Sequence, residues 1–254
     1  PASTLYNEFN GWGNSLDALE AADAALCAVG ITDYVSLDGY QRIRDEIQNN
    51  GRLSKFSLVV PNIEFRITPF TKKGAAINLH ILIDPKDSDH IQKIDDALSR
   101  LTFKYQGGQK YPCSQVGLRD LGMAFDPLIK DDQVAYREGV NQFKPDFDAF
   151  RDWYEGEKWL RRNSLVVVSN GSNDGASGLS HDDGYKAKRQ EIYRFSHAVF
   201  SGNPKDREYF CGKGSDSEDQ LVKTISGRKP CIHGSDAHKE EQLFMPAEER
   251  FCWI

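Results

Sequence analysis

Short apolar segments that alternate with amphipathic helical segments are the feature of this sequence that most limits its fold. Apolar runs of strand length occur at 26–32, 56–61, 63–67, 76–84, 164–169, 198–201 and 230–233. Segments with helical spacing or helix caps lie at 15–25, 36–49, 87–101, 183–197, 204–210 and 218–225. This alternation favours an α/β fold, without deciding whether the sheet closes into a barrel.

The middle of the chain, residues 102–163, breaks this alternation. It contains no convincing strand, and aromatic residues recur there at helical spacing, namely Phe143, Phe147, Phe150, Trp153 and Tyr154. Pro145 precedes most of them and suits the first turn of a helix. We therefore expect a helical insertion that caps a single domain, residues 1–254, rather than a separate core. Ordinary packing explains the aromatic residues best.

Composition excludes several classes of protein. No apolar run approaches the roughly 20 residues that a membrane span needs, and the first residues show neither the basic nor the apolar region of a signal peptide. With 32 basic and 38 acidic residues the net charge is −6, so we expect no broad basic surface for nucleic acid. Five cysteines at irregular spacing, without a CxxC pair, indicate a reducing, cytoplasmic compartment and mostly buried thiols.

Motifs of nucleotide hydrolysis and of serine hydrolases are absent. The loop 171–178 is rich in Gly, Ser and Asn and can offer backbone N–H groups to a phosphate. Neither this loop nor the segment 212–215 matches a P-loop, so a mobile polar loop is the simpler interpretation of both. No Gly-x-Ser-x-Gly motif occurs. His90 and His181 lie in charged, polar contexts, which indicates surface positions.

Polar residues that can bind metal ions recur where the expected strands end. They are Asp33, Glu64, His80, Asn170, Asn203, Asp236 and His238. In (β/α) barrels the carboxyl ends of the strands form the active site. We therefore expect several of these side chains to share one site.

Two of these residues stand inside apolar strands. A carboxylate such as Glu64 needs a partner there, because an unpaired buried charge is very costly. A metal ion, an ion pair with Arg66 and outward exposure all remain open for it. His80 can bind a metal ion through one ring nitrogen while the other is held by an acceptor, although a hydrogen-bonded core histidine is the commoner outcome.

The sharpest motif follows the last expected strand. Asp236 and His238 stand two residues apart in the segment Gly-Ser-Asp-Ala-His. In an extended turn their side chains point to one side and can bind one metal ion or two adjacent ions. A polar loop is the alternative. His233, just before this segment, fits a structural role better.

These residues, taken in order, resemble a known family. The segment 30–33 (Gly-Ile-Thr-Asp), Glu64, His80 and the segment 234–238 resemble the motifs of the PHP (polymerase and histidinol phosphatase) metallohydrolases. The segments 200–208 and 229–238 are most similar to the PHP-type N-terminal domain of TrlF-like AAA-type ATPases. The resemblance covers nearly the whole chain.

The resemblance implies a distorted (β/α)7 barrel whose two or three divalent metal ions, Zn, Mn or Fe, hydrolyse phosphoesters. The implied metal ligands are Glu64, His80, Asp236 and His238, and the candidate catalytic residues are Asp33, Glu64 and Asp236. We add Asn170, Asn203 and Arg207 as candidates for substrate binding. Lys205, Arg207, Lys213 and Lys239 can contact a substrate phosphate, with a solvated surface as the alternative.

The chain departs from the family pattern in three places. The opening His-x-His motif is missing, so we expect the chain to start after it. Tyr34 stands where a His usually follows Thr-Asp, and the segment 169–171 (Ser-Asn-Gly) replaces a His-Pro motif.

Three functions follow from this pattern. The leading hypothesis is a phosphoesterase, a nuclease or nucleotide phosphatase that acts beside an AAA-type ATPase in DNA repair or phage defence. The second is a degenerate barrel that serves as a sensor or scaffold for the ATPase. The third is amidohydrolase-like chemistry on a substrate without phosphate.

Overall fold

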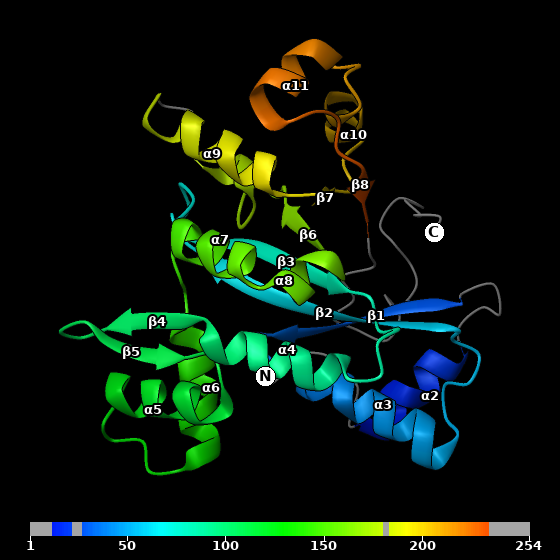
Figure 1. Ribbon diagram of the computed structural model, residues 1–254, viewed down its shortest axis with the longest axis vertical. Coiled ribbons are helices and arrows are strands. Elements are labelled where there is room, and N and C mark those ends of the chain that lie inside the picture. Colours follow the sequence, from blue (N-terminus) through cyan, green and yellow to red (C-terminus); the bar gives the residue numbers. More distant parts are fainter. Residues whose placement is uncertain (1–11, 22–26, 180–182, 234–254) are drawn as a thin grey trace. The chain divides into compact units, whose positions relative to one another are not determined.

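The computed structural model describes residues 12–21, 27–179 and 183–233 and has a mixed α/β structure (Figure 1). Six strands form one sheet in the order β1-β2-β3-β6-β7-β8. They are β1 (Ala28–Tyr34), β2 (Leu58–Ile67), β3 (Ile77–Ile83), β6 (Ser164–Ser169), β7 (Ala198–Phe200) and β8 (Cys231–Ile232). The predicted α/β class is therefore confirmed. The strand order ends at β1 on one side and β8 on the other, so a closed seven-stranded barrel remains a prediction.

The strands do not all run in one direction. β1 and β2 are parallel to each other, and so are β6, β7 and β8. β3 runs opposite to β6, because Asn78 N–H donates to the Asp174 carbonyl at one end and Asp84 N–H donates to the Asn163 carbonyl at the other, both at 2.7 Å (Figure 1). Residues 68–76 join β2 to β3 without a helix. The sequence likewise predicts no helix between the strands expected at 63–67 and 76–84, and a parallel pair would need a longer crossover connection.

The chain divides into two compact units, which we describe separately. Unit 1 consists mainly of residues 23–68 and 81–164, and unit 2 mainly of residues 4–22, 69–80 and 165–254. The helices of unit 1 are α3 (Asp38–Asn50), α4 (His90–Arg100), α5 (Gln115–Phe125), α6 (Asp132–Gln142), α7 (Phe147–Gly156) and α8 (Lys158–Arg162). Those of unit 2 are α2 (Trp12–Ala21), α9 (Asp183–Phe195), α10 (Pro204–Phe210), α11 (Glu218–Ile225) and the 3-10 helix η1 (Ala176–Gly178).

Most predicted boundaries agree with the structure to within a few residues. Gly51 ends α3 in the left-handed conformation (φ 65°), as its position after the helix predicts. The Asn203 side chain accepts a hydrogen bond from Lys205 N–H at the start of α10, which confirms the predicted cap. The two strands expected at 56–61 and 63–67 are one continuous strand, β2.

The insertion at 102–163 is largely helical, as expected, but it also contains an antiparallel hairpin that the sequence analysis missed. Its strands are β4 (Thr102–Tyr105) and β5 (Gln109–Pro112). Gln106, Gly107 and Gly108 all have positive φ values in the turn between them. The Gly-Gly pair is the signal for such a turn, but only four residues on each side, many of them polar, form the strands.

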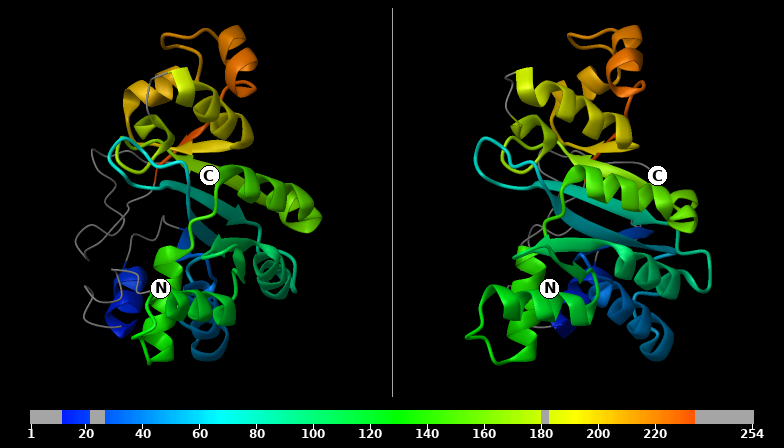
Figure 2. Two further views of the ribbon diagram at one scale, coloured as in Figure 1. Left: turned by 90° about the vertical axis from the view of Figure 1, so that its left-hand side faces the viewer. Right: turned by 60° about the vertical axis from the view of Figure 1, so that its left-hand side comes forward.

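The core of unit 1 joins the insertion to the sheet. Phe65 on β2 and Phe150 on α7 are both fully buried, and their ring centres lie 4.9 Å apart in an edge-to-face arrangement. Trp153 packs on both rings and donates its indole N–H to the Ala97 carbonyl of α4. In both views of Figure 2, α5 and α6 lie against each other. The aromatic residues are thus packing residues, and the insertion shares a core with the sheet.

Two expectations about burial are wrong. His90 is buried rather than on the surface: its Nε2 lies 2.8 Å from the Tyr40 hydroxyl, and its Nδ1 lies 2.6 Å from the Asp87 carbonyl. Among the four cysteines that the structure describes, only Cys113 is buried, while Cys27 is exposed. His181 and Cys252 lie outside the described residues. Within the described ranges, no helix has the length and apolar character that crossing a bilayer requires.

Candidate functional site

Asp33, a candidate catalytic residue in unit 1, connects β1 to α3. Its carboxylate is 4% exposed and accepts hydrogen bonds from Gly39 N–H (3.0 Å) and Tyr40 N–H (2.9 Å). A Cβ atom at position 39 would lie 2.6 Å from the carboxylate, so the glycine makes room for it. Burial nevertheless raises the pKa of Asp33 to about 6, because desolvation outweighs the two hydrogen bonds. Asp33 therefore has a structural task at the start of α3.

Glu64 lies beside Tyr34, which is its neighbour in the parallel register of β1 and β2. Glu64 is 7% exposed, so outward exposure is ruled out for this carboxylate. The Tyr34 hydroxyl forms hydrogen bonds with both Glu64 and Arg66, and the Arg66 guanidinium carbon lies 4.4 Å from the centre of the Tyr34 ring. Burial, and then the charge of Glu64, raise the pKa of Tyr34. Tyr34 thus links the buried carboxylate to the arginine.

His80, the candidate ligand in unit 2, lies in the middle of β3 and not at its end. Its ring packs edge-to-face on the ring of Phe200, with 4.7 Å between the ring centres. Burial lowers the pKa of His80 to about 4, so the imidazole is neutral at pH 7. A neutral imidazole has a lone pair available for a metal ion, which is the form that metal binding needs.

The carboxyl ends of β7 and β8 meet beside this histidine. Phe200, the last residue of β7, is paired with Ile232, the last residue of β8. Ser201 N–H then donates to the Ile232 carbonyl at 3.0 Å. β8 therefore ends beside the strand end whose Phe200 contacts His80, and the described residues stop at His233. Asp236 and His238 themselves lie outside the described residues.

Asn170, a candidate for substrate binding, is the centre of a polar network in unit 2. Its Nδ2 donates to Asp206 at 2.8 Å, its Oδ1 accepts from the Tyr193 hydroxyl, and its carbonyl accepts from Ser177 Oγ at 2.5 Å. Asp206 also accepts from Ser201 Oγ at 2.6 Å. The side chain of Asn170 is buried and its amide groups are used within the protein, so it holds the ends of β6 and β7 together.

The remaining candidates in unit 2 are exposed. Asn203 caps α10, and Arg207 lies on the surface of the same helix, as does Lys205. Lys213 is exposed as well, and Lys239 is not among the described residues. Their exposure agrees with the solvated-surface interpretation of these basic side chains.

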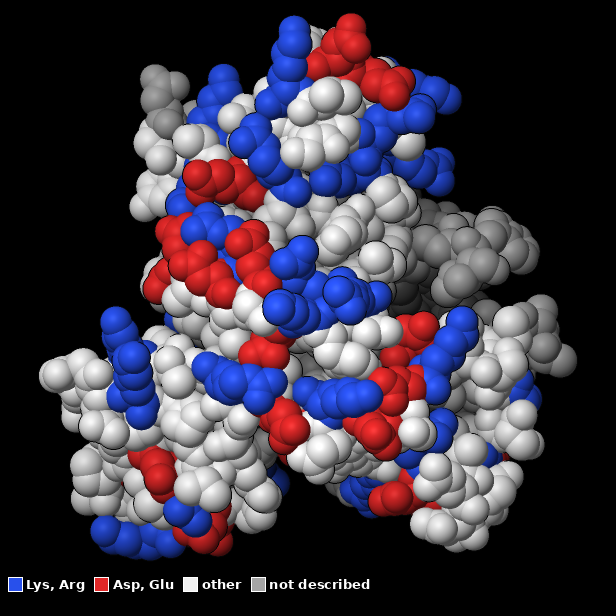
Figure 3. All heavy atoms as spheres, viewed as in Figure 1, with Lys and Arg blue, Asp and Glu red and all other residues white. Residues whose placement is uncertain are grey.

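The face shown in Figure 3 carries Lys and Arg side chains interleaved with Asp and Glu. In unit 1, Lys93 pairs with Asp87 at 2.5 Å, and Arg100 binds Glu157 through two nitrogens at 2.6 and 2.8 Å. These ion pairs neutralise two of the basic side chains of unit 1.

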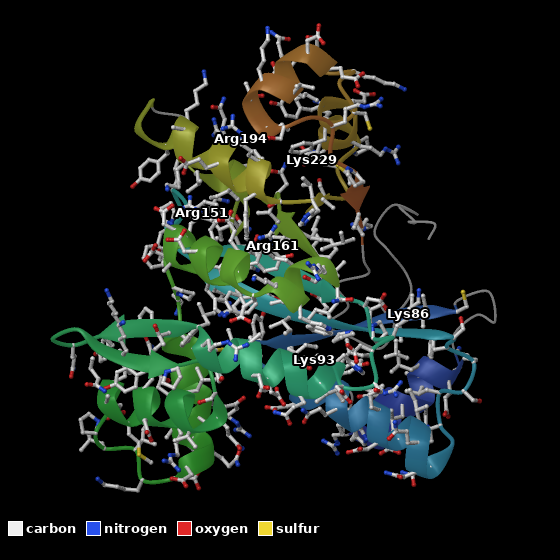
Figure 4. All side chains as sticks on the ribbon, in the orientation of Figure 1. Lys86, Lys93, Arg151, Arg161, Arg194 and Lys229 are labelled. Carbon is white, nitrogen blue, oxygen red and sulfur yellow. The ribbon has the colours of Figure 1, made fainter. Side chains whose placement is uncertain are left out.

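Two sets of polar side chains were not predicted from the sequence. Asp206 and Tyr193 are central to the Asn170 network, yet each stands in a helix whose polar spacing gives no sign of it. Lys229, labelled in Figure 4, is 8% exposed and donates its ammonium to the Ser196 carbonyl at 2.8 Å. Burial lowers the pKa of Lys229, and the pKa of His197 is lowered by burial and by this lysine. Nothing in the sequence indicates that Lys229 is buried, because an Arg-Lys-Pro segment is typical of a surface turn.

Within the described ranges, no three His, Cys, Asp or Glu side chains come together in a group that could hold a metal ion. Asp33 and Glu64 belong to unit 1, whereas His80, Asn170, Asn203 and Arg207 belong to unit 2. No protein-family model matches the chain, and no curated protein matches it.

Proposed function

We propose that the chain is a metal-dependent phosphoesterase of the PHP type, with a distorted (β/α)7 barrel, that acts as a nuclease or nucleotide phosphatase beside an AAA-type ATPase module. The observation that carries the proposal is the pairing of β7 with β8 at Phe200, which contacts His80. This arrangement supports the proposal because the most specific motif follows β8 directly in the sequence.

The donor chemistry fits a divalent ion such as Zn, Mn or Fe. His80 has a neutral imidazole at pH 7, and Glu64 is a buried carboxylate. Imidazole and carboxylate groups suit these metals, and Asp236 and His238 would add one of each. Bound metal ions would polarise the phosphoester and supply the nucleophile for its hydrolysis.

The other residues of the chain hold these donors in place. Phe200 restricts the His80 ring through its edge-to-face contact, and Tyr34 holds the Glu64 carboxylate by a hydrogen bond. Asp33 fixes the turn between β1 and α3 directly after Tyr34. Asn170 and Asp206 join the ends of β6 and β7. Such supporting contacts orient ligands and reduce the reorganisation that metal binding would need.

Metal content measured by elemental analysis tests the proposal. We expect near-stoichiometric Zn, Mn or Fe in the purified chain and loss of that metal in Glu64→Ala, His80→Leu and Asp236→Ala. Glu155→Ala removes an exposed carboxylate and is the matched control. Circular dichroism checks that each variant folds. Equal metal content in all variants, or no metal after incubation with these ions in a variant with an added N-terminal His-x-His segment, would refute the proposal.

The second candidate, a catalytically degenerate barrel that acts as a sensor or scaffold for an ATPase, is favoured by one observation. Tyr34 occupies the position of a usual histidine ligand, and its hydroxyl is engaged with Glu64 and Arg66. A chain that binds metal but hydrolyses neither bis(p-nitrophenyl) phosphate nor a panel of nucleotides would support this candidate over the enzyme.

A further inference from the structure

We propose that residues 69–76 of unit 2, together with the adjoining residues 171–173, bind single-stranded nucleic acid through a base stacked on Phe70 and phosphates held by Lys72 and Lys73. This inference names the substrate class of the proposed phosphoesterase. It rests on the proposed function for the reaction itself.

Phe70 is unusual for its exposure. Its side chain is 52% exposed in a connection between two strands, although a phenylalanine is normally buried. Thr71 directly after it is 5% exposed, and Lys72 and Lys73 are both exposed. The segment therefore presents one aromatic ring and two ammonium groups to solvent, while the threonine between them points inward.

The segment is held firmly by the turn 171–178. Thr71 Oγ1 donates to the Asn173 carbonyl at 2.6 Å, and Lys72 N–H donates to the Gly178 carbonyl at 2.9 Å. A Cβ atom at Gly178 would lie 2.9 Å from the Thr71 methyl group, which shows how closely the two segments pack. The turn is therefore fixed rather than a mobile loop. A fixed backbone lowers the entropy that ordering the segment on binding would cost.

The charge of this surface is positive. Among the residues that the structure describes, neither Lys72 nor Lys73 has a carboxylate within 4.0 Å; Lys73 Nζ donates to the neutral amide of Asn173. Asp174, the acidic residue of the turn, is bound to Asn78 at 3.1 Å. Gly171, Ser172 and Asn173 are exposed beside the lysines. Two ammonium groups without a carboxylate partner in the described part of the chain, next to polar groups, suit a phosphate backbone.

The single exposed ring decides the kind of partner. Bases of a single strand are open for stacking on an aromatic side chain, whereas those of a duplex are stacked on one another. A membrane surface fits less well, because one phenylalanine with two lysines lacks the apolar area of a stable anchor. The surface thus fits an unpaired segment of DNA or RNA.

The test is the affinity of the full chain for a fluorescein-labelled oligothymidylate of about 16 nucleotides, measured by anisotropy with EDTA present. We expect Phe70→Ala to weaken binding roughly 5- to 150-fold. We expect Lys72→Gln/Lys73→Gln to weaken it and to reduce the salt dependence, the slope of log K against log salt, by about 1.4. The matched control is Lys104→Gln/Lys110→Gln, which removes two exposed lysines paired across the β4–β5 hairpin.

Several results would overturn the inference. They are no binding at low salt, wild-type affinity in Phe70→Ala, equal losses in the two double-lysine variants, and binding to phosphatidylserine vesicles but not to the oligonucleotide. Because EDTA prevents metal-dependent turnover, this assay reports binding alone. Its failure is therefore distinguishable from failure of the phosphoesterase proposal, which the metal content of the chain tests.

Discussion

The contact between α5 and α6 allows a sharp test of how the insertion is packed. Gly139 on α6 lies so close to α5 that a Cβ atom there would be 1.7 Å from the Leu118 carbonyl oxygen. Gly122 on α5 makes the reciprocal approach, with 1.9 Å to the Ala135 carbonyl oxygen. Both obstacles are backbone atoms, so no side-chain rotation relieves them. Glycine at these two positions is what lets the helices touch.

Gly139→Ala should therefore separate the two helices. Ordinary contact begins near 3.4 Å, so the backbones must move apart by about 1.7 Å, which weakens the packing of Leu118, Leu121 and Ala135. Overpacking costs about 1–3 kcal/mol, and a backbone obstacle places this variant near the upper end. The better helix propensity of alanine offsets up to about 1 kcal/mol. The net loss of unfolding free energy is about 2 kcal/mol.

Gly156→Ala is the matched control, because position 156 also lies in a helix of unit 1 and a methyl group added there would have nothing within 4 Å. We expect it to leave the stability unchanged or to raise it by up to about 1 kcal/mol. Urea denaturation of both variants measures the difference as a shift in midpoint at constant slope. If Gly139→Ala is as stable as Gly156→Ala, the inference that the backbones of α5 and α6 are in contact at Gly139 is refuted.

Three further predictions concern Asp33, Lys229 and Asn203. The folded protein binds the Asp33 proton more tightly than the unfolded chain, with a pKa of about 6 against 3.8, so this residue lowers the unfolding free energy by about 2 kcal/mol as the pH rises from 4 to 6. The fall should be smaller in Asp33→Asn when urea midpoints are compared across this range. The pKa of Lys229 is lowered, so the unfolded chain binds the extra proton and stability should rise with pH below the ordinary lysine pKa of 10.5; Lys229→Met should abolish that rise, and an unchanged profile would contradict it. Asn203→Ala removes the cap of α10 and should cost about 1 kcal/mol in thermal or urea unfolding, whereas Asn203→Asp should retain the cap.

The local features of the fold were accessible from sequence wherever one residue controls one hydrogen bond or one backbone conformation. Gly51 ends α3 because the left-handed conformation favours glycine, and Asn203 begins α10 because its side chain replaces a missing backbone acceptor. The direction of β3 was not accessible in this way. Its alternating burial is the same whichever way the strand runs, and only the helix-free connection 68–76 indicates that it reverses.

The candidate site shows a similar limit. The polar residues at strand ends were chosen because their chemistry suits metal or phosphate, but the same groups can satisfy the unpaired backbone groups that every strand end and helix start exposes. Asp33 accepts two backbone N–H groups at α3, Asn170 joins the ends of β6 and β7, and Asn203 caps α10. The hydrogen bonds of these three residues within the protein account for their residue types without any ligand. Glu64 and His80 differ, because a carboxylate and an imidazole within strands cap no helix. The proposal of a metal centre therefore depends on Glu64, His80 and the segment 234–238, and substitutions there, rather than at the capping residues, are the ones that test it.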